Sequence, residues 1–154
     1  MMNAIMKHRL VRMLWFPIFL LLIHILTWAV QIRHYGFYLD DWVSLSAYDQ
    51  GGFEGLMQYS IIDSRPGLMM WVIGLGFKLF GNNRLWWQLW SLFWRYQAGL
   101  AAWLLIKSLW PRKQTVAEFS AILLMIFPFF KHQALSIVYN MQWIQYALIL
   151  YSFW

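Results

Sequence analysis

Residues 13–30 read MLWFPIFLLLIHILTWAV, eighteen positions in which His24 is the one ionisable side chain. A helix of this length covers most of a hydrocarbon core roughly 30 Å thick. The run is longer than the apolar core of about 7–15 residues in a signal peptide, and Thr27-Trp28-Ala29 offers no small-x-small cleavage site. The stretch therefore predicts an uncleaved signal anchor, with a cleaved signal peptide as the alternative. We expect His24 to face a helix bundle and form a hydrogen bond, a ligand role being the alternative.

The rest of the chain has the same apolar character. Of its 154 residues 62% are hydrophobic and 12% charged, against about 45–50% and about 25% in soluble domains. This composition predicts an all-α, polytopic transmembrane helix bundle. The net charge of +6 comes from basic residues that stand singly or in short groups, a pattern that argues against nucleic-acid binding. The absence of cysteine excludes disulfides, thiolate metal sites and cysteine nucleophiles.

We expect a single membrane domain over residues 1–154, and because the last apolar run stops without a polar tail, an N-terminal fragment of a longer chain. The predicted segments are a first span at 13–30, an extracytoplasmic loop with amphipathic juxtamembrane helices at 31–84, spans at 85–106 and 116–130, and an incomplete last span at 137–154.

The distribution of basic residues predicts the orientation. Lys7, Arg9 and Arg12 precede the first span, so the positive-inside rule places the N-terminus in the cytoplasm and the following loop outside. Pro66 can begin a helix and Gly81 can end it, which predicts a helix from Pro66 to Phe80. If that helix does not cross, the loop around 107–113 is cytoplasmic; if it crosses, the loop lies outside. The first topology is favoured by one charge. We expect an integral, multi-pass protein of the bacterial inner (plasma) membrane.

The predicted extracytoplasmic loop holds most of the acidic residues. Five of the six acidic residues lie between residues 36 and 66, beginning with the adjacent pair Asp40-Asp41. Neighbouring carboxylates raise the pKa of one member when they are buried together, which suits a general base or a shared metal. The alternative is that the pair begins a juxtamembrane helix, where carboxylates favour the positive end of the helix dipole. Asp49-Gln50-Gly51-Gly52 predicts a turn between two short helices.

Chemistry beyond the carboxylate pair is sparse. No His-Glu-x-x-His, Asp-x-Asp or glycine-rich phosphate loop is present, so no cofactor is predicted, and a divalent metal stays possible without a supporting motif. Arg95 lies near the centre of the 85–106 run, where a charge costs about 2.5–3.5 kcal/mol unless it faces a partner or a cavity. We consider two interpretations of Arg95. It forms a hydrogen bond within the bundle, to Gln88, Gln97 or a backbone carbonyl, or it has a functional role. Small residues follow Arg95 and should let another helix approach closely: Ala98, Gly99, Ala101 and Ala102.

Three short motifs follow the first span in a particular order. They are Phe37-Tyr38-Leu39-Asp40-Asp41-Trp42, Arg65-Pro66-Gly67-Leu68 and Phe77-Lys78-Leu79-Phe80-Gly81-Asn82-Asn83. In order and spacing they resemble the N-terminal part of GT-C-type membrane glycosyltransferases, the relatives of the dolichyl-phosphate-mannose protein mannosyltransferases. Pro128 to Ala134 more loosely resembles the second extracytoplasmic loop of that group. Members of the family are several times longer, and some carry an acidic residue in the second loop where this chain has Gln133 and Asn140.

The resemblance implies a function. Its members move a sugar from a lipid-linked donor, a polyprenyl or dolichyl phosphate, to an acceptor hydroxyl outside the cytoplasm; membrane lipid is a further partner, and the acceptor here is unknown. Carried over, Asp40 or Asp41 is the catalytic base, and Arg65 with Lys131 or His132 binds the donor phosphate. The alternative is a non-catalytic membrane subunit or lipid-phosphate carrier that uses the same surface for binding only.

Overall fold

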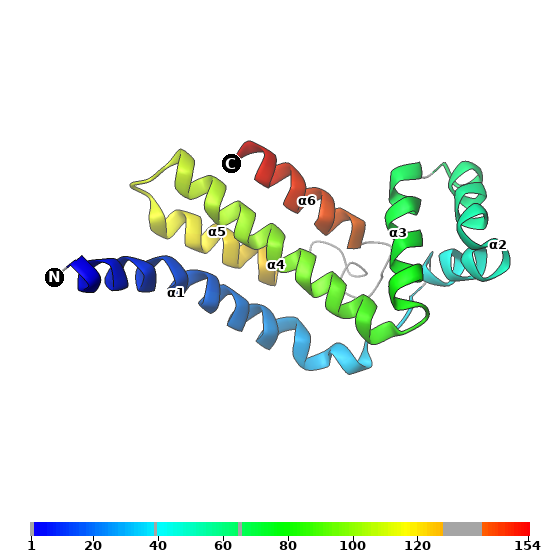
Figure 1. Ribbon diagram of the computed structural model, residues 1–154, viewed down its shortest axis with the longest axis horizontal. Coiled ribbons are helices and arrows are strands. Elements are labelled where there is room, and N and C mark those ends of the chain that lie inside the picture. The colour runs from blue at the N-terminus through cyan, green and yellow to red at the C-terminus, as the bar shows by residue number, and fades with distance from the viewer. Residues whose placement is uncertain (1, 39, 65, 128–139) are drawn as a thin grey trace. The chain divides into compact units, whose positions relative to one another are not determined.

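The fold is all-helical, as the composition predicts. The computed structural model describes residues 2–38, 40–64, 66–127 and 140–154 (Figure 1). The elements in those ranges are α1 (Met2–Trp28), the 3-10 helix η1 (Ala29–His34), α2 (Asp40–Ile62), α3 (Gly67–Phe80), α4 (Arg84–Leu109), α5 (Gln114–Ile126) and α6 (Asn140–Phe153).

One stretch of helix within the described ranges is long and apolar enough to cross a bilayer. It runs from Leu14 to His34, with a mean hydropathy of 1.9, and overlaps the first predicted span, 13–30, in all but its first residue. A signal sequence near an N-terminus can also satisfy this test of length and hydropathy. Helices α3 and α5 are also apolar but shorter. The described part of the chain therefore contains one candidate for a membrane-spanning helix, so the structure does not by itself support the predicted polytopic bundle.

The described residues form two compact units. The first comprises Met1–Val30, Leu92–Phe127 and Tyr146–Trp154, and the second comprises Gln31–Ser91 and Pro128–Gln145, each without the positions excluded above. In the first unit α1 packs against α5. Its buried core consists of Phe16, Leu20, Trp103, Ala117, Ala121 and Met125.

Small residues on α4 allow close packing in the first unit, as predicted. Ala98 and Ala101 are fully buried. A Cβ atom added to Gly99 would lie 2.4 Å from the Met125 sulfur, closer than any side chain tolerates. Glycine at position 99 therefore lets the α4 backbone approach the side chain that α5 presents.

Helix α2 in the second unit is bent at one residue. Gly52 has φ 58° and ψ −138°, a backbone conformation outside the helical region that glycine adopts without steric cost. Beyond the bend, a Cβ atom at Gly55 would lie 2.2 Å from the Ala47 carbonyl oxygen. The predicted turn over Asp49 to Gly52 is therefore wrong in extent, because the helix continues through Gly51 and Gly52 alone absorbs the change of direction.

Helix α3 has the ends that its sequence predicts. It starts directly after Pro66, whose φ of −57° suits a helix start, and it ends at Gly81 with φ 53°. The Gly81 N–H donates to the Phe77 carbonyl oxygen at 2.8 Å and so closes the last turn.

Aromatic rings fill the space around α3. Tyr48 of α2 stacks on Phe77 with ring centroids 4.9 Å apart. Trp87 of α4 meets Phe77 edge-on, also at 4.9 Å, and its indole N–H donates to the Gly81 carbonyl oxygen at 2.9 Å. Gly76 lies directly under the Trp87 ring, since an added Cβ atom would be 2.2 Å from one of the ring carbons. These contacts hold α2, α3 and the start of α4 together in the second unit.

Candidate functional site

The two adjacent aspartates open α2, and Asp41 fixes the start of the helix. Asp41 is only 2% exposed. Its carboxylate Oδ2 accepts a hydrogen bond from the Tyr38 backbone N–H at 2.8 Å, and the Asp41 N–H donates to the Tyr38 carbonyl oxygen at 2.9 Å. A side chain that reaches back to an unpaired N–H before the first turn is the acidic half of a capping box. Asp41 therefore stabilises the entry into the helix.

Asp40 lies on another side of the same helix. Successive helical residues are about 100° apart around the axis. Asp41 shares its side with Leu45, one turn later, which is buried. Asp40 shares its side with Ala47, which is half-buried, and with Ser44, which is buried, and its own side chain is half-buried. The helical period thus separates a buried, capping carboxylate from one that is accessible.

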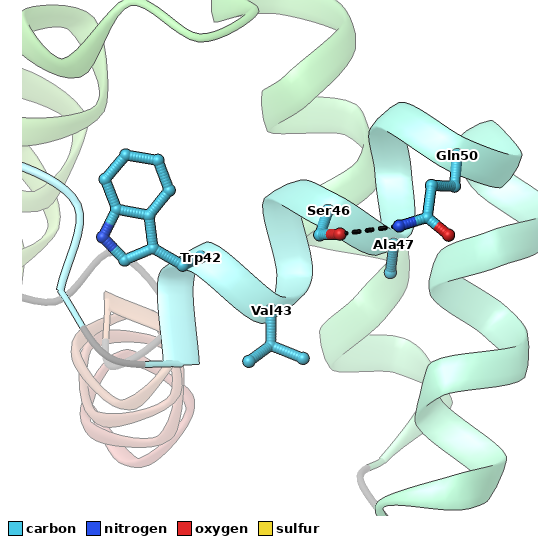
Figure 2. A pocket seen from close by; sticks show the side chains of 5 residues that line it. All are labelled: Trp42, Val43, Ser46, Ala47 and Gln50. Carbon is cyan, nitrogen blue, oxygen red and sulfur yellow. Dashed lines mark hydrogen bonds between the residues drawn. The ribbon is translucent and has the colours of Figure 1, made fainter.

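The exposed side of α2 carries a hollow. Figure 2 shows its lining, which comes entirely from this helix: Trp42, Val43, Ser46, Ala47 and Gln50. The hollow has a volume of about 450 Å³. The Trp42 side chain is 57% exposed, and the Phe37 ring lies against it with centroids 5.5 Å apart.

Two polar side chains complete the lining of the hollow. The Gln50 side-chain amide donates to the Ser46 hydroxyl oxygen at 2.8 Å (Figure 2). An exposed indole next to an amide and a hydroxyl suits a ligand that has one apolar face and several hydroxyl groups. Asp40 precedes Val43 by one helical turn, and Val43 belongs to the lining of the hollow.

The other predicted site residues do not enter this geometry. Arg65, Lys131 and His132 lie outside the described residues. The candidate site therefore consists of Asp40, Asp41 and the hollow. Within the described ranges no three His, Asp or Glu side chains come together in a group that could hold a metal ion.

A second polar cluster lies inside the first unit. His24 is buried, and its Nε2–H donates to the Leu92 carbonyl oxygen at 3.0 Å, which confirms the predicted bundle-facing hydrogen bond. Arg95 is 4% exposed, and its guanidinium carbon lies 4.0 Å from the centroid of the Trp28 ring. The Trp28 indole N–H donates to the Met125 carbonyl oxygen at 2.8 Å, which fixes the ring.

Arg95 thus faces the protein interior, as we predicted from the cost of a charge in lipid. The sequence did not predict its aromatic partner, Trp28. Trp28 is 67 residues earlier in the chain, and no local pattern connects the two positions. A guanidinium over a desolvated indole contributes about 2 kcal/mol. The contact joins α1 to α4 within the first unit.

Sequence reasoning also missed the polar side of α4 in the second unit. The Gln88 amide donates to the Gly36 carbonyl oxygen at 3.3 Å, and the Ser91 hydroxyl donates to the Asn140 side-chain oxygen. Gln88 and Ser91 are both buried and stand three residues apart, on one side of α4. The spacing of these two polar residues, three positions apart, is the feature of the sequence that could have predicted a buried polar side of α4.

Comparisons with protein-family models, with curated proteins and with solved structures find no match to this chain.

Proposed function

We propose that this chain is the membrane part of a glycosyltransferase that moves a sugar from a polyprenyl or dolichyl phosphate donor to an acceptor hydroxyl outside the cytoplasm. The observation that carries the proposal is the different placement of the two aspartates. Asp41 is buried and caps α2, whereas Asp40 is half-buried and lies one helical turn before Val43, which lines the hollow. Of the two carboxylates that the resemblance offers, we therefore assign the base to Asp40.

In the proposed reaction the acceptor oxygen forms a bond to the anomeric carbon of the sugar while the bond from that carbon to the lipid phosphate breaks. The acceptor proton passes to Asp40, and the phosphate leaves with the electron pair. Proton removal by a positioned carboxylate contributes about 10²–10⁴-fold to such a step. Cations must balance the charge on the leaving phosphate. Arg65, with Lys131 or His132, is assigned that role by resemblance.

The placement of polar and apolar side chains in the first unit supports a multi-pass membrane protein. His24 and Arg95 are buried, while large apolar side chains on α1 and α5 face outward: Leu26 is 71% exposed and Phe119 63%. Ionisable side chains inside and apolar ones outside suit a helix bundle surrounded by lipid. We propose a multi-pass protein of the bacterial inner membrane, and the basic residues before the first span are the reason for proposing a cytoplasmic N-terminus.

Transfer of a labelled sugar tests the proposed function. The reading frame, with any coding sequence that continues past Trp154, is purified and reconstituted with a radiolabelled polyprenyl-phosphate sugar and a panel of hydroxyl acceptors. A transferase moves label into an acceptor. A lipid-phosphate carrier binds the donor and leaves all label on the lipid, and that result would reject the enzyme proposal.

A further inference from the structure

The turn between α4 and α5 in the first unit brings two cations and an indole around a second hollow. Its lining is continuous in sequence and exposed throughout: Leu109, Trp110, Pro111, Arg112 and Lys113. The hollow has a volume of about 350 Å³. None of these residues takes part in the proposed sugar transfer.

Two backbone hydrogen bonds fix the shape of this turn. The Trp110 N–H donates to the Ile106 carbonyl oxygen at 2.9 Å and closes the last turn of α4. The Lys113 N–H donates to the Trp110 carbonyl oxygen at 2.9 Å, which defines a β-turn with Pro111 at its second position. Proline at that position presets the backbone angle that the turn requires. The backbone of the turn is therefore shaped before a ligand binds, so the entropy lost on binding comes mainly from the side chains.

The charge around the turn is positive. Arg112 and Lys113 line the hollow. Lys107 lies near the end of α4, before the turn, with its Nζ 4.5 Å from the Trp103 ring centroid. The next carboxylate along α5 is Glu118, which accepts a hydrogen bond from the Gln114 amide at 2.8 Å. The turn thus offers cations to a ligand that carries negative charge.

An apolar flank ends where these cations begin. Helix α5 exposes Val116, Phe119 and Leu123 at a spacing of three and four residues, which places them on one side of the helix. Leu109 and Trp110 of the turn are exposed as well. In membrane proteins, apolar side chains lie in the hydrocarbon core, tryptophan lies at the interface and basic residues lie among the headgroups. The side chains around this turn have the same order.

We propose that the α4–α5 turn binds the phosphate of an anionic phospholipid. Arg112 supplies a planar, bidentate donor group that fits two phosphate oxygens, and Lys113 supplies a second positive charge. Trp110 and Leu109 lie against the upper part of the acyl chains. Each basic side chain near an anionic surface strengthens binding roughly fivefold.

Selectivity between two quenching lipids tests the proposal. The full chain has no cysteine, so Ser108→Cys provides one labelling position next to the turn; Ser108 is exposed. The labelled protein is placed in phosphatidylcholine nanodiscs that contain equal fractions of either brominated phosphatidylglycerol or brominated phosphatidylcholine. The anionic lipid should quench the fluorophore more strongly, and this preference should weaken as salt is added.

Matched charge removals locate the site. The double variant Arg112→Gln/Lys113→Gln should lose the preference for the anionic lipid, because each removed cation weakens binding to that lipid roughly fivefold. The control Lys78→Gln/Arg84→Gln removes the same charge from exposed positions in the second unit and should retain it. Equal quenching by both lipids in the parent, or an equal loss in the control, would overturn the proposal. Neither donor nor acceptor is present, so failure here is distinguishable from failure of sugar transfer.

Discussion

Replacing Gly76 by alanine should destabilise the second unit, although alanine is the better helix former. Gly76 is buried in α3, and a Cβ atom there would lie 2.2 Å from one carbon of the Trp87 ring and 2.6 Å from another. The ring cannot easily move away, because its N–H is bonded to the Gly81 carbonyl oxygen and its edge contacts Phe77.

The size of the effect follows from a matched comparison with Gly51→Ala. Gly51 is an exposed helical residue with no atom within 4 Å of an added Cβ. Both substitutions gain about 0.8–1 kcal/mol of helix propensity. Only Gly76→Ala adds overpacking, which costs about 1–3 kcal/mol. The two variants should therefore differ by about 1–3 kcal/mol in the free energy of unfolding, with Gly76→Ala the less stable.

Thermal or denaturant unfolding in detergent micelles, followed by circular dichroism, measures this difference. The substitution Trp87→Phe removes the ring carbons that the new Cβ atom would meet. Its cost in free energy of unfolding should therefore be at least roughly 0.5 kcal/mol smaller in the Gly76→Ala background than in the parent protein. If Gly76→Ala is as stable as Gly51→Ala, the close contact between α3 and the Trp87 ring is wrong.

Two further predictions follow from the aspartate pair and from the proposed topology. Asp41→Ala should lower the free energy of unfolding by about 1–2 kcal/mol because the Tyr38 N–H loses its acceptor, whereas Asp49→Ala, at an exposed position of the same helix, should change it by less than about 0.5 kcal/mol; equal losses in chemical denaturation would contradict the capping role of Asp41. Single cysteines at Ser46 and Ser108 should label from opposite sides of the membrane with an impermeant reagent, and labelling of both from outside would favour a crossing by α3.

Much of the local structure could be predicted because it depends on residues that are close in sequence. Pro66 and Gly81 delimit α3 through their own backbone preferences, and both ends agree with the prediction. The sequence also predicted a change of direction within α2, but the predicted turn over Asp49 to Gly52 was longer than the bend at Gly52. A cluster of turn-forming residues predicts an open loop, whereas in the structure Gly52 is the residue with non-helical φ and ψ, and the backbone passes so close to the Ala47 carbonyl oxygen at Gly55 that a Cβ atom would not fit there.

The site was harder to predict because it depends on what packs around each helix. The helical period alone separates Asp40 from Asp41 by about 100°. It does not tell which of them faces the protein interior, since that depends on the contacts of neighbouring side chains. The cost of a charge in lipid likewise predicted that Arg95 would face inward, but it could not select Trp28 from twelve tryptophans.

The measurement that tests the central claim most directly is sugar transfer by Asp40→Asn beside Asp41→Asn. Asparagine keeps the size of the side chain but cannot accept the proton, so Asp40→Asn should lower turnover by roughly 10²–10⁴ while donor affinity stays unchanged. Asp41→Asn retains an oxygen that can accept from the Tyr38 N–H, and its turnover should remain within a few-fold of the parent. Near-parental turnover in Asp40→Asn, or a large loss confined to Asp41→Asn, would contradict the assignment of Asp40 as the base.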